Sequence, residues 1–358
     1  MVGLRTAAPL LIALVLSAVA TPLRAAAAAP PAKKLDTLRV YLDWSMNVEF
    51  AGEYAALKKG WYAEEGIDPK FVFDGIEIIP NVMKGMADIG MQSGHDIIRH
   101  IGQGTKIKAF SAKYQISPDS IVVNQDSEIR AIKDLKGKRV GVFSTQEYDM
   151  FRVMLGSAGL TMQDVTFVPI KTFVETEIIA LMRAKTVDAI IAWEFNWTTS
   201  FALLGHKLRV FPGYENGFHF YGITYFGPTA FVDKNRDLLR RFLRATYRGW
   251  QEVYRDPDHY AARVVDDWYP KDRYIAGSRD LTLQQQRLEL RLRKKYFFEG
   301  VGRDGIGTMS RWKWSKAIEI ARRAGMVPAD SKLTVDDVID PISTTEETRP
   351  AKVPDGPK

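Results

Sequence analysis

The sequence predicts an α/β fold of two lobes joined by two crossovers, and three observations support this prediction. Short apolar segments typical of strands alternate with amphipathic segments typical of helices from Leu38 onward. The alternation pauses near Ser117 and Pro118 and then begins again. An extended stretch within residues 218–230 leads into four long amphipathic helices instead of another round. The chain therefore builds one lobe, inserts a second, and returns to the first.

The first lobe is placed at residues 36–116. A helix is expected over residues 50–64, because Phe50, Tyr54 and Leu57 recur at helical spacing and glycines punctuate its end. Four strands and two further helices complete this part. The strands are expected at 38–42, 70–73, 87–91 and 106–112, and the helices at 78–86 and 96–102.

The second lobe is placed at residues 117–224, and the return to the first lobe at 225–343. The tryptophans of the returning helices recur at amphipathic spacing, so Trp250, Trp268, Trp312 and Trp314 are expected in the core. The second lobe is expected to hold strands at 120–123, 137–142, 165–169 and 189–193 and helices at 132–135, 147–158 and 175–184. The returning helices are expected at 237–254, 260–268, 283–298 and 311–324.

The two ends of the chain differ in composition from the lobes. Arg5 precedes an apolar run at residues 7–20 that is too short to span a bilayer comfortably, and small residues follow at 25–29. Residues 1–29 are therefore predicted to be a cleaved signal peptide, and the periplasm is the expected location. The polar, proline-containing tail at 344–358 is expected to be disordered.

Composition excludes several function classes. The formal net charge is +7, but the basic residues are dispersed and no nucleic-acid reader motif is present, so nucleic acid is not an expected partner. The chain has no cysteine, which rules out disulfides, cysteine nucleophiles, thiolate metal sites and a lipid-modified N-terminal cysteine. Its five histidines show no ligand spacing. No metal or cofactor is expected.

Two crossovers between lobes form a hinge, and ligand clefts favour the crevice at the carboxyl ends of the strands. Asp43 and Trp44 directly follow the first expected strand. Stacking on the indole would add about 0.5–1.5 kcal/mol for a flat ring, and a carboxylate would accept a hydrogen bond from a ring amine. The alternative is that Trp44 belongs to the core and Asp43 caps the next helix.

Other candidate ligand contacts lie near the ends of the expected strands or near the return crossover, and two of them have a stated structural alternative. Asn47 either contacts ligand or caps a helix, and Tyr221 either forms a wall of the cleft or packs between the lobes. Ser93 follows the strand at 87–91. Glu194 and Trp197 follow the strand at 189–193.

Carboxylates are prominent among these candidates. Glu147 lies in the first turn of an expected helix, where its own charge occupies a position that suits an anionic ligand. Asp43, Glu147, Glu175 and Glu194 together would give the cleft an acidic lining. Such a lining fits an amino-bearing ring better than a sulfonate or nitrate ion.

Several segments resemble the solute-binding proteins for pyrimidine precursors of thiamine, which share a fold with the fungal-type hydroxymethylpyrimidine synthases. The resemblance runs from about residue 38 to 339 and is most specific at its start. The segments that carry it are LDWSMN at 42–47, AGEYAA at 51–56, KGWYAEEGI at 59–67, GMADIG at 85–90, DLKGKRVG at 134–141, VDAI at 187–190, Trp314, and GMV at 325–327.

The resemblance implies a type II periplasmic-binding fold that closes over its ligand. It implies a monomeric binding component of an ABC importer, with permease and ATPase subunits as partners and a pyrimidine-type thiamine precursor as ligand. Sulfonate, nitrate, bicarbonate and flavin ligands remain alternatives. The acid directly after Trp193 departs from the thiamine-precursor pattern and is closer to the pattern of the sulfonate and nitrate binders.

The related synthases use a lysine-anchored pyridoxal phosphate, a nearby histidine and a cysteine-rich iron site. The segment that resembles theirs places Gln92 where that lysine would lie, and an amide cannot form a Schiff base. His95 falls one position away from the expected histidine, and cysteine is absent. A binding protein is therefore expected and an enzyme is not.

Overall fold

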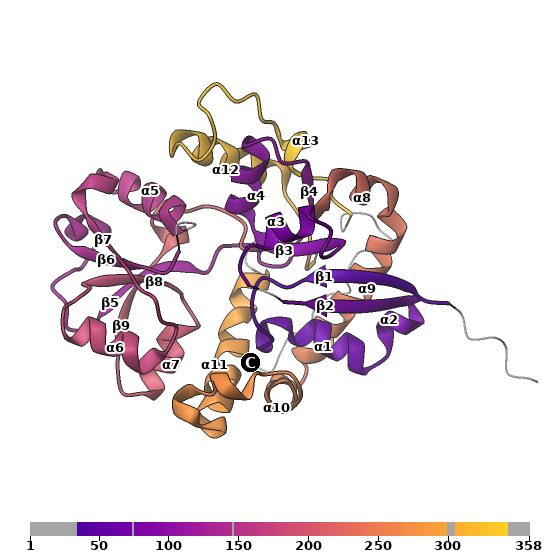
Figure 1. Ribbon diagram of the computed structural model, residues 1–358, viewed down its shortest axis with the longest axis horizontal. Coiled ribbons are helices and arrows are strands. Elements are labelled where there is room, and N and C mark those ends of the chain that lie inside the picture. Colours follow the sequence, from indigo (N-terminus) through magenta and orange to yellow (C-terminus); the bar gives the residue numbers. More distant parts are fainter. Residues whose placement is uncertain (1–33, 74, 145–146, 299–304, 343–358) are drawn as a thin grey trace, which may run out of the picture. The chain divides into compact units, whose positions relative to one another are not determined.

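The computed structural model describes residues 34–342 except 74, 145–146 and 299–304. Two five-stranded sheets, each flanked by helices, form the two lobes (Figure 1). The predicted fold class is confirmed. The expected signal peptide and the expected C-terminal tail lie outside the described residues. Within the described part of the chain, no helix is long and apolar enough to cross a membrane.

The sheet of the first lobe has the order β2-β1-β3-β10-β4. β1 pairs in parallel with β2 and β3, whereas β10 is antiparallel to both β3 and β4. Because β10 follows the second lobe in sequence, the returning chain completes the sheet of the first. The strands are β1 (Asp36–Tyr41), β2 (Ile67–Val72), β3 (Ile89–Ser93), β4 (Ile107–Ala112) and β10 (Ile223–Pro228). The chain thus re-enters the first sheet at Ile223, two residues before the expected return at 225.

The sheet of the second lobe has the order β7-β6-β8-β5-β9. It repeats the arrangement of the first, with two parallel neighbours around β6 and the antiparallel strand β5 between β8 and β9. The strands are β5 (Asp119–Asn124), β6 (Arg139–Val142), β7 (Thr166–Pro169), β8 (Ala189–Trp193) and β9 (Leu208–Pro212). β9 was not anticipated.

The same polar contact fixes the register of the central strands in both lobes. In the first lobe, the Arg39 amide donates to the Asp88 carboxylate at 2.8 Å, and the Asp88 amide donates back to the Arg39 carbonyl at 2.9 Å. Arg139 and Asp188 make the equivalent pair of bonds in the second lobe. Each aspartate also holds its arginine side chain, so one Arg–Asp pair in each lobe aligns two neighbouring parallel strands.

Alternating side chains of each sheet meet helices on its two faces. In β5, Ile121 and Val123 pack in the same cluster as residues of α5, whereas Val122 packs with residues of α6 and α7. Figure 1 shows the second sheet between these helices. This period of two is what buries a strand on both faces. The three helices are α5 (Tyr148–Ser157), α6 (Glu175–Arg183) and α7 (Trp197–Leu203).

Most expected helices are present within a few residues of their predicted bounds. The helix expected over 50–64 is divided, because Gly60 adopts φ 76° and separates its last turn. The short α7 and α8 were not anticipated. The other helices are α1 (Ala51–Lys58), α2 (Trp61–Glu64), α3 (Ile78–Met83), α4 (Gly94–Gly102), α8 (Thr229–Lys234), α9 (Arg236–Val253), α10 (Pro257–Asp267), α11 (Arg279–Phe298), α12 (Arg311–Arg323) and α13 (Val335–Val338), with 3₁₀ turns that include η1 (Val48–Phe50) and η2 (Ile132–Leu135).

Trp312 corrects one core prediction. Trp250 and Trp314 are fully buried, and Trp268 packs partly buried against the first-lobe core. Trp312, in contrast, is 70% exposed. It lies in the first turn of α12, two positions from the buried Trp314, and therefore faces away from the core.

The two crossovers between the lobes run side by side. The Tyr114 amide donates to the Ile223 carbonyl, and the Ser117 amide donates to the Phe220 carbonyl. These bonds, at 3.0 and 3.1 Å, join the chain leaving the first lobe to the chain that returns. A paired two-stranded connection of this kind forms the hinge between the lobes.

The contact between α1 and α9 gives a test of the packing. A Cβ on Gly249 would lie 2.0 Å from the Gly52 carbonyl oxygen, so G249A is expected to destabilise the protein by about 1–3 kcal/mol. In the matched control G156A, on α5, a Cβ would meet nothing within 4 Å. That variant is expected to be neutral or slightly more stable, since alanine favours helix over glycine. Urea unfolding of both variants checks this, and equal effects would contradict the packing.

Candidate functional site

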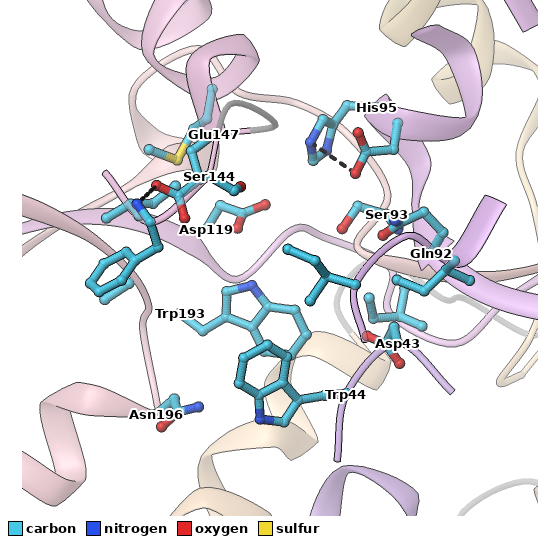
Figure 2. A pocket seen from close by; sticks show the side chains of 18 of the residues that line it. Asp43, Trp44, Gln92, Ser93, His95, Asp119, Ser144, Glu147, Trp193 and Asn196 are labelled. Atoms are coloured by element: carbon cyan, nitrogen blue, oxygen red, sulfur yellow. Dashed lines mark hydrogen bonds and ion pairs between the residues drawn. The ribbon is translucent and has the colours of Figure 1, made fainter. Parts of the chain in front are cut away.

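A cavity of about 230 Å³ lies between the two lobes and is lined by residues of both. Figure 2 shows Asp119, Ser144 and Glu147 on one side of it and Gln92, Ser93 and His95 on the other. Trp44 and Trp193 lie toward one end. Polar and aromatic side chains therefore both face the enclosed space.

The edges of the two sheets position these side chains. Asp43 follows the carboxyl end of β1, Ser93 ends β3, and Trp193 ends β8. Asp119 begins the antiparallel strand β5 and pairs directly with Trp193, so the start of β5 lies at the same edge. The cavity is thus the crevice at the carboxyl ends of the parallel strands, the expected place for a ligand.

Aromatic side chains form a continuous wall that spans the lobes. Trp44 of the first lobe meets Phe173 of the second edge-on, with ring centroids 5.6 Å apart. Phe173 stacks on Phe143 at 5.3 Å, and Phe143 meets Trp197 at 4.5 Å. Phe173 is 51% exposed although it is apolar. This wall offers a flat ring aromatic faces from both lobes.

Carboxyl groups dominate the polar lining. Asp43, Glu49, Asp96, Asp119 and Glu147 line the cavity, and among the described lining residues none is lysine or arginine. Asp43 is 8% exposed, and its Oδ1 has no hydrogen-bond partner within the described part of the chain. Burial, and then the nearby Glu49, raise the pKa of Asp43 well above its usual range. Burial likewise raises the pKa of Asp119.

Glu147 turns its carboxyl group back onto the loop that follows β6. The Phe143 amide donates to Glu147 Oε2 at 2.9 Å. Burial raises the pKa of Glu147 to about 8, and the nearby Asp119 adds to this effect. The backbone donor that would suit an anionic ligand in front of α5 is therefore engaged by the protein's own acid.

Five of the eight predicted ligand contacts are brought together at this cavity. These are Asp43, Trp44, Ser93, Glu147 and Trp197. Asn47, Glu194 and Tyr221 are not among the residues that line it. Contact with ligand stays a prediction for all eight, and the structure gives the last three other partners.

Asn47 and Tyr221 make the structural contacts that were their alternatives. Asn47 caps η1, because its side-chain oxygen accepts from the Glu49 amide at 2.6 Å. Tyr221 stacks on Trp314 at 5.1 Å, and its hydroxyl accepts from the Ser310 amide at 2.7 Å. Both side chains are buried within the protein.

Glu194 makes its contacts with residues that do not line the cavity. Its Oε2 accepts hydrogen bonds from Tyr296, on α11 of the first lobe, and from Tyr214 at 3.3 Å. Lys295 lies 3.8 Å from its Oε1. Glu194 thus connects the two lobes and is not part of the acidic lining that was expected of it. That lining is formed by Asp43, Glu49, Asp96, Asp119 and Glu147. Glu175 is also absent from the lining.

Several lining residues were not anticipated. Phe143 and Phe173 follow β6 and β7, so attention to every strand end would have found them. Asp119 begins a strand, and only the antiparallel pairing of β5 places it at the cavity. Among the described residues, no group of three or more His, Cys, Asp or Glu side chains is arranged to hold a metal ion.

Residues 47–260 match the family described as NMT1/THI5 like. The chain belongs to this family. The matched residues include η1, most of both sheets and both crossovers between the lobes. The predicted family resemblance is confirmed.

Two relatives of this chain are named as binding proteins. The riboflavin-binding protein RibY of Chloroflexus aurantiacus is 25% identical over 323 residues, which cover 86% of this chain and 88% of the relative. The formylaminopyrimidine-binding protein of Halalkalibacterium halodurans is 22% identical over 231 residues, or 63% of this chain and 68% of the relative. These relatives agree with the expectation of a binding protein and not an enzyme.

Solved structures share the fold. The periplasmic aliphatic sulphonate binding protein SsuA of Escherichia coli superposes with a TM-score of 0.59 at 17% identity, covering 90% of this chain and 95% of that one. The structure of the desulfurization enzyme DSZB matches with a TM-score of 0.54 at 14% identity, covering 87% and 98%. These likenesses show the fold. Together with the family match, the relatives named as binding proteins identify a substrate-binding protein of the ABC import type.

The raised pKa of Glu147 gives a prediction for stability. An acid whose pKa rises from 4.5 to about 8 on folding binds its proton more tightly in the folded state. The contribution of Glu147 to the free energy of unfolding is fully present below pH 4.5 and is lost as the pH rises toward 8. Between pH 5.5 and 8.5, the wild type is therefore expected to lose at least about 1.4 kcal/mol more unfolding free energy than E147Q, the equivalent of one pKa unit. Urea unfolding at both pH values measures the difference, and identical losses would contradict it.

Proposed function

We propose that this chain captures an uncharged, flat pyrimidine-type precursor of thiamine and delivers it to an ABC permease and its ATPase. The observation that carries the proposal is the combination of aromatic walls with an acidic lining that contains no described lysine or arginine. A ring that donates N–H bonds fits such a lining, and a sulfonate or nitrate ion does not. The proposed setting is the periplasm, reached by a cleaved signal peptide.

The buried charges behind the lining support a ligand that donates hydrogen bonds. Lys113 pairs with Glu53 at 3.2 Å, and Arg293 pairs with Glu289 at 2.9 Å. Glu49 also faces Arg293, at 3.6 Å. The two cations are thereby engaged by other acids. Asp43 lines the cavity, and its buried Oδ1 has no hydrogen-bond partner among the described residues. An N–H donor of the ligand would pair with this carboxyl group.

The size of the cavity favours a single ring. Its volume of about 230 Å³ lies below the range of roughly 300–1,000 Å³ that is typical of pockets for drug-sized ligands. A substituted pyrimidine requires less space than the three fused rings and polyol chain of riboflavin. Riboflavin is nevertheless a second candidate, because the similarity to the riboflavin-binding relative extends over 323 residues.

Titration calorimetry with a panel of ligands tests the assignment. The panel is formylaminopyrimidine, riboflavin, taurine, nitrate and bicarbonate. Formylaminopyrimidine is expected to bind with a Kd of about 1 μM or below, equivalent to about −8.2 kcal/mol. Tight binding of one of the anions, with no binding of either ring compound, would overturn the proposal.

Two substitutions test the roles of the opening motif. W44A is expected to weaken binding of the ring ligand about tenfold through lost stacking and burial, and D43N by about tenfold or more through loss of a charge-assisted bond. The matched controls are W312A and D233N, which alter exposed side chains of the same types. Both controls are expected to bind like the wild type. Equal losses in a substitution and its control would contradict these roles.

A further inference from the structure

Four charged side chains of alternating sign run from the cavity wall of the first lobe into the second lobe. Asp96 and Arg99 belong to α4, and Asp149 and Arg152 belong to α5. Arg99 pairs with Asp96 within the first lobe, and Arg152 pairs with Asp149 at 2.8 Å within the second. Arg99 Nε also lies 2.9 Å from Asp149 Oδ2. This last ion pair is the link of the series that crosses between the lobes.

The crossing pair is shielded from solvent. The side chains of Asp149 and Asp96 are 4% and 5% exposed, and that of Arg99 is 19% exposed. Salt screens a buried pair much less than a surface pair. Close charge pairs across protein interfaces also have measured coupling energies well above those of surface pairs. The Arg99–Asp149 contact is therefore placed to affect the balance between open and closed lobes.

The local pairs make this contact reversible. If the lobes separate, Arg99 keeps Asp96 three residues away on its own helix, and Asp149 keeps Arg152 three residues away on its own helix. Removing one partner of a buried pair is costly when it leaves a charge unpaired. Here neither charge is stranded in either state, so the lobes open without that cost.

The series ends at the cavity. Asp96 lines it directly, and Met150, the residue after Asp149, lines it from the second lobe. His95 lies 3.7 Å from the Asp96 carboxylate and also lines the cavity. A ligand that fills the cavity therefore touches side chains on both helices that carry the ion pair.

We propose that the Arg99–Asp149 ion pair is a latch that holds the two lobes closed over the cavity. Arg99 acts as a positioning residue, since it joins α4 to α5 through its two carboxylate partners. The latch rests on the two-lobed fold and does not depend on which ligand is bound.

Because the chain has no cysteine, spin labels test the latch without a background signal. K84C in the first lobe and K133C in the second replace exposed lysines and carry one nitroxide each. Pulsed electron paramagnetic resonance then measures the distance between the lobes in the protein without added ligand. R99Q and D149N are expected to lower the closed-to-open ratio by about tenfold and to lengthen and broaden the distances. The double variant is expected to be no worse than either single variant.

The control is D188N, which removes an ion pair of the same type that lies within the second lobe. It is expected to leave the distances unchanged. R99K keeps the positive charge, but the lysine ammonium lacks the planar, multi-donor guanidinium that contacts both carboxylates. A distance distribution between those of the wild type and R99Q is therefore expected. Circular dichroism confirms that each variant is folded. Distances in R99Q, R99K and D149N equal to those of the wild type, or an equal shift in D188N, would overturn the latch. Since no ligand is used, this outcome is independent of the ligand assignment.

Discussion

A shortage of positive charge behind the cavity is the constraint on which the site depends. Lys113 and Arg293 are the cations that face Asp43, Glu49, Glu53 and Glu289. All six side chains are buried. Burial raises the pKa of Asp43 and of Glu49, and it raises the pKa of Glu289 to about 7. Two cations cannot compensate four buried acids, and Asp43 and Glu49 are the two of these acids that line the cavity. Under the proposed function, N–H donors of the ligand pair with these two carboxyl groups.

The same constraint explains how one fold serves different ligands. SsuA, a sulphonate binding protein, shares the architecture of this chain at 17% identity. Function in such folds is determined by the side chains at the site and not by the scaffold. In this chain, Glu147 accepts the Phe143 amide, and Asp119 adds a second acid nearby. Under the proposed function these acids disfavour an anionic ligand, although the fold is shared with a protein named for binding sulphonates.

Much of the fold was predictable because its signals are local. A short stretch of consecutive residues is enough to recognise an apolar strand, a glycine break or an amphipathic helix. Asp43 and Trp44 were predictable for the same reason, since they directly follow a strand. The contacts of Glu194 were not predictable in this way, because its partner Tyr296 is more than 100 residues away in sequence, on α11. Asp119 was missed because only strand pairing brings it to the cavity.

The central claim is that the ligand donates hydrogen bonds to buried acids, and proton release on binding tests it most directly. Calorimetric titration of formylaminopyrimidine at pH 7, repeated in buffers of different ionisation enthalpy, measures the number of protons exchanged. Donation to the carboxyl groups lowers the raised pKa values of Asp43 and Glu147, so the account predicts net proton release. Net proton uptake, or no exchange despite tight binding, would contradict it.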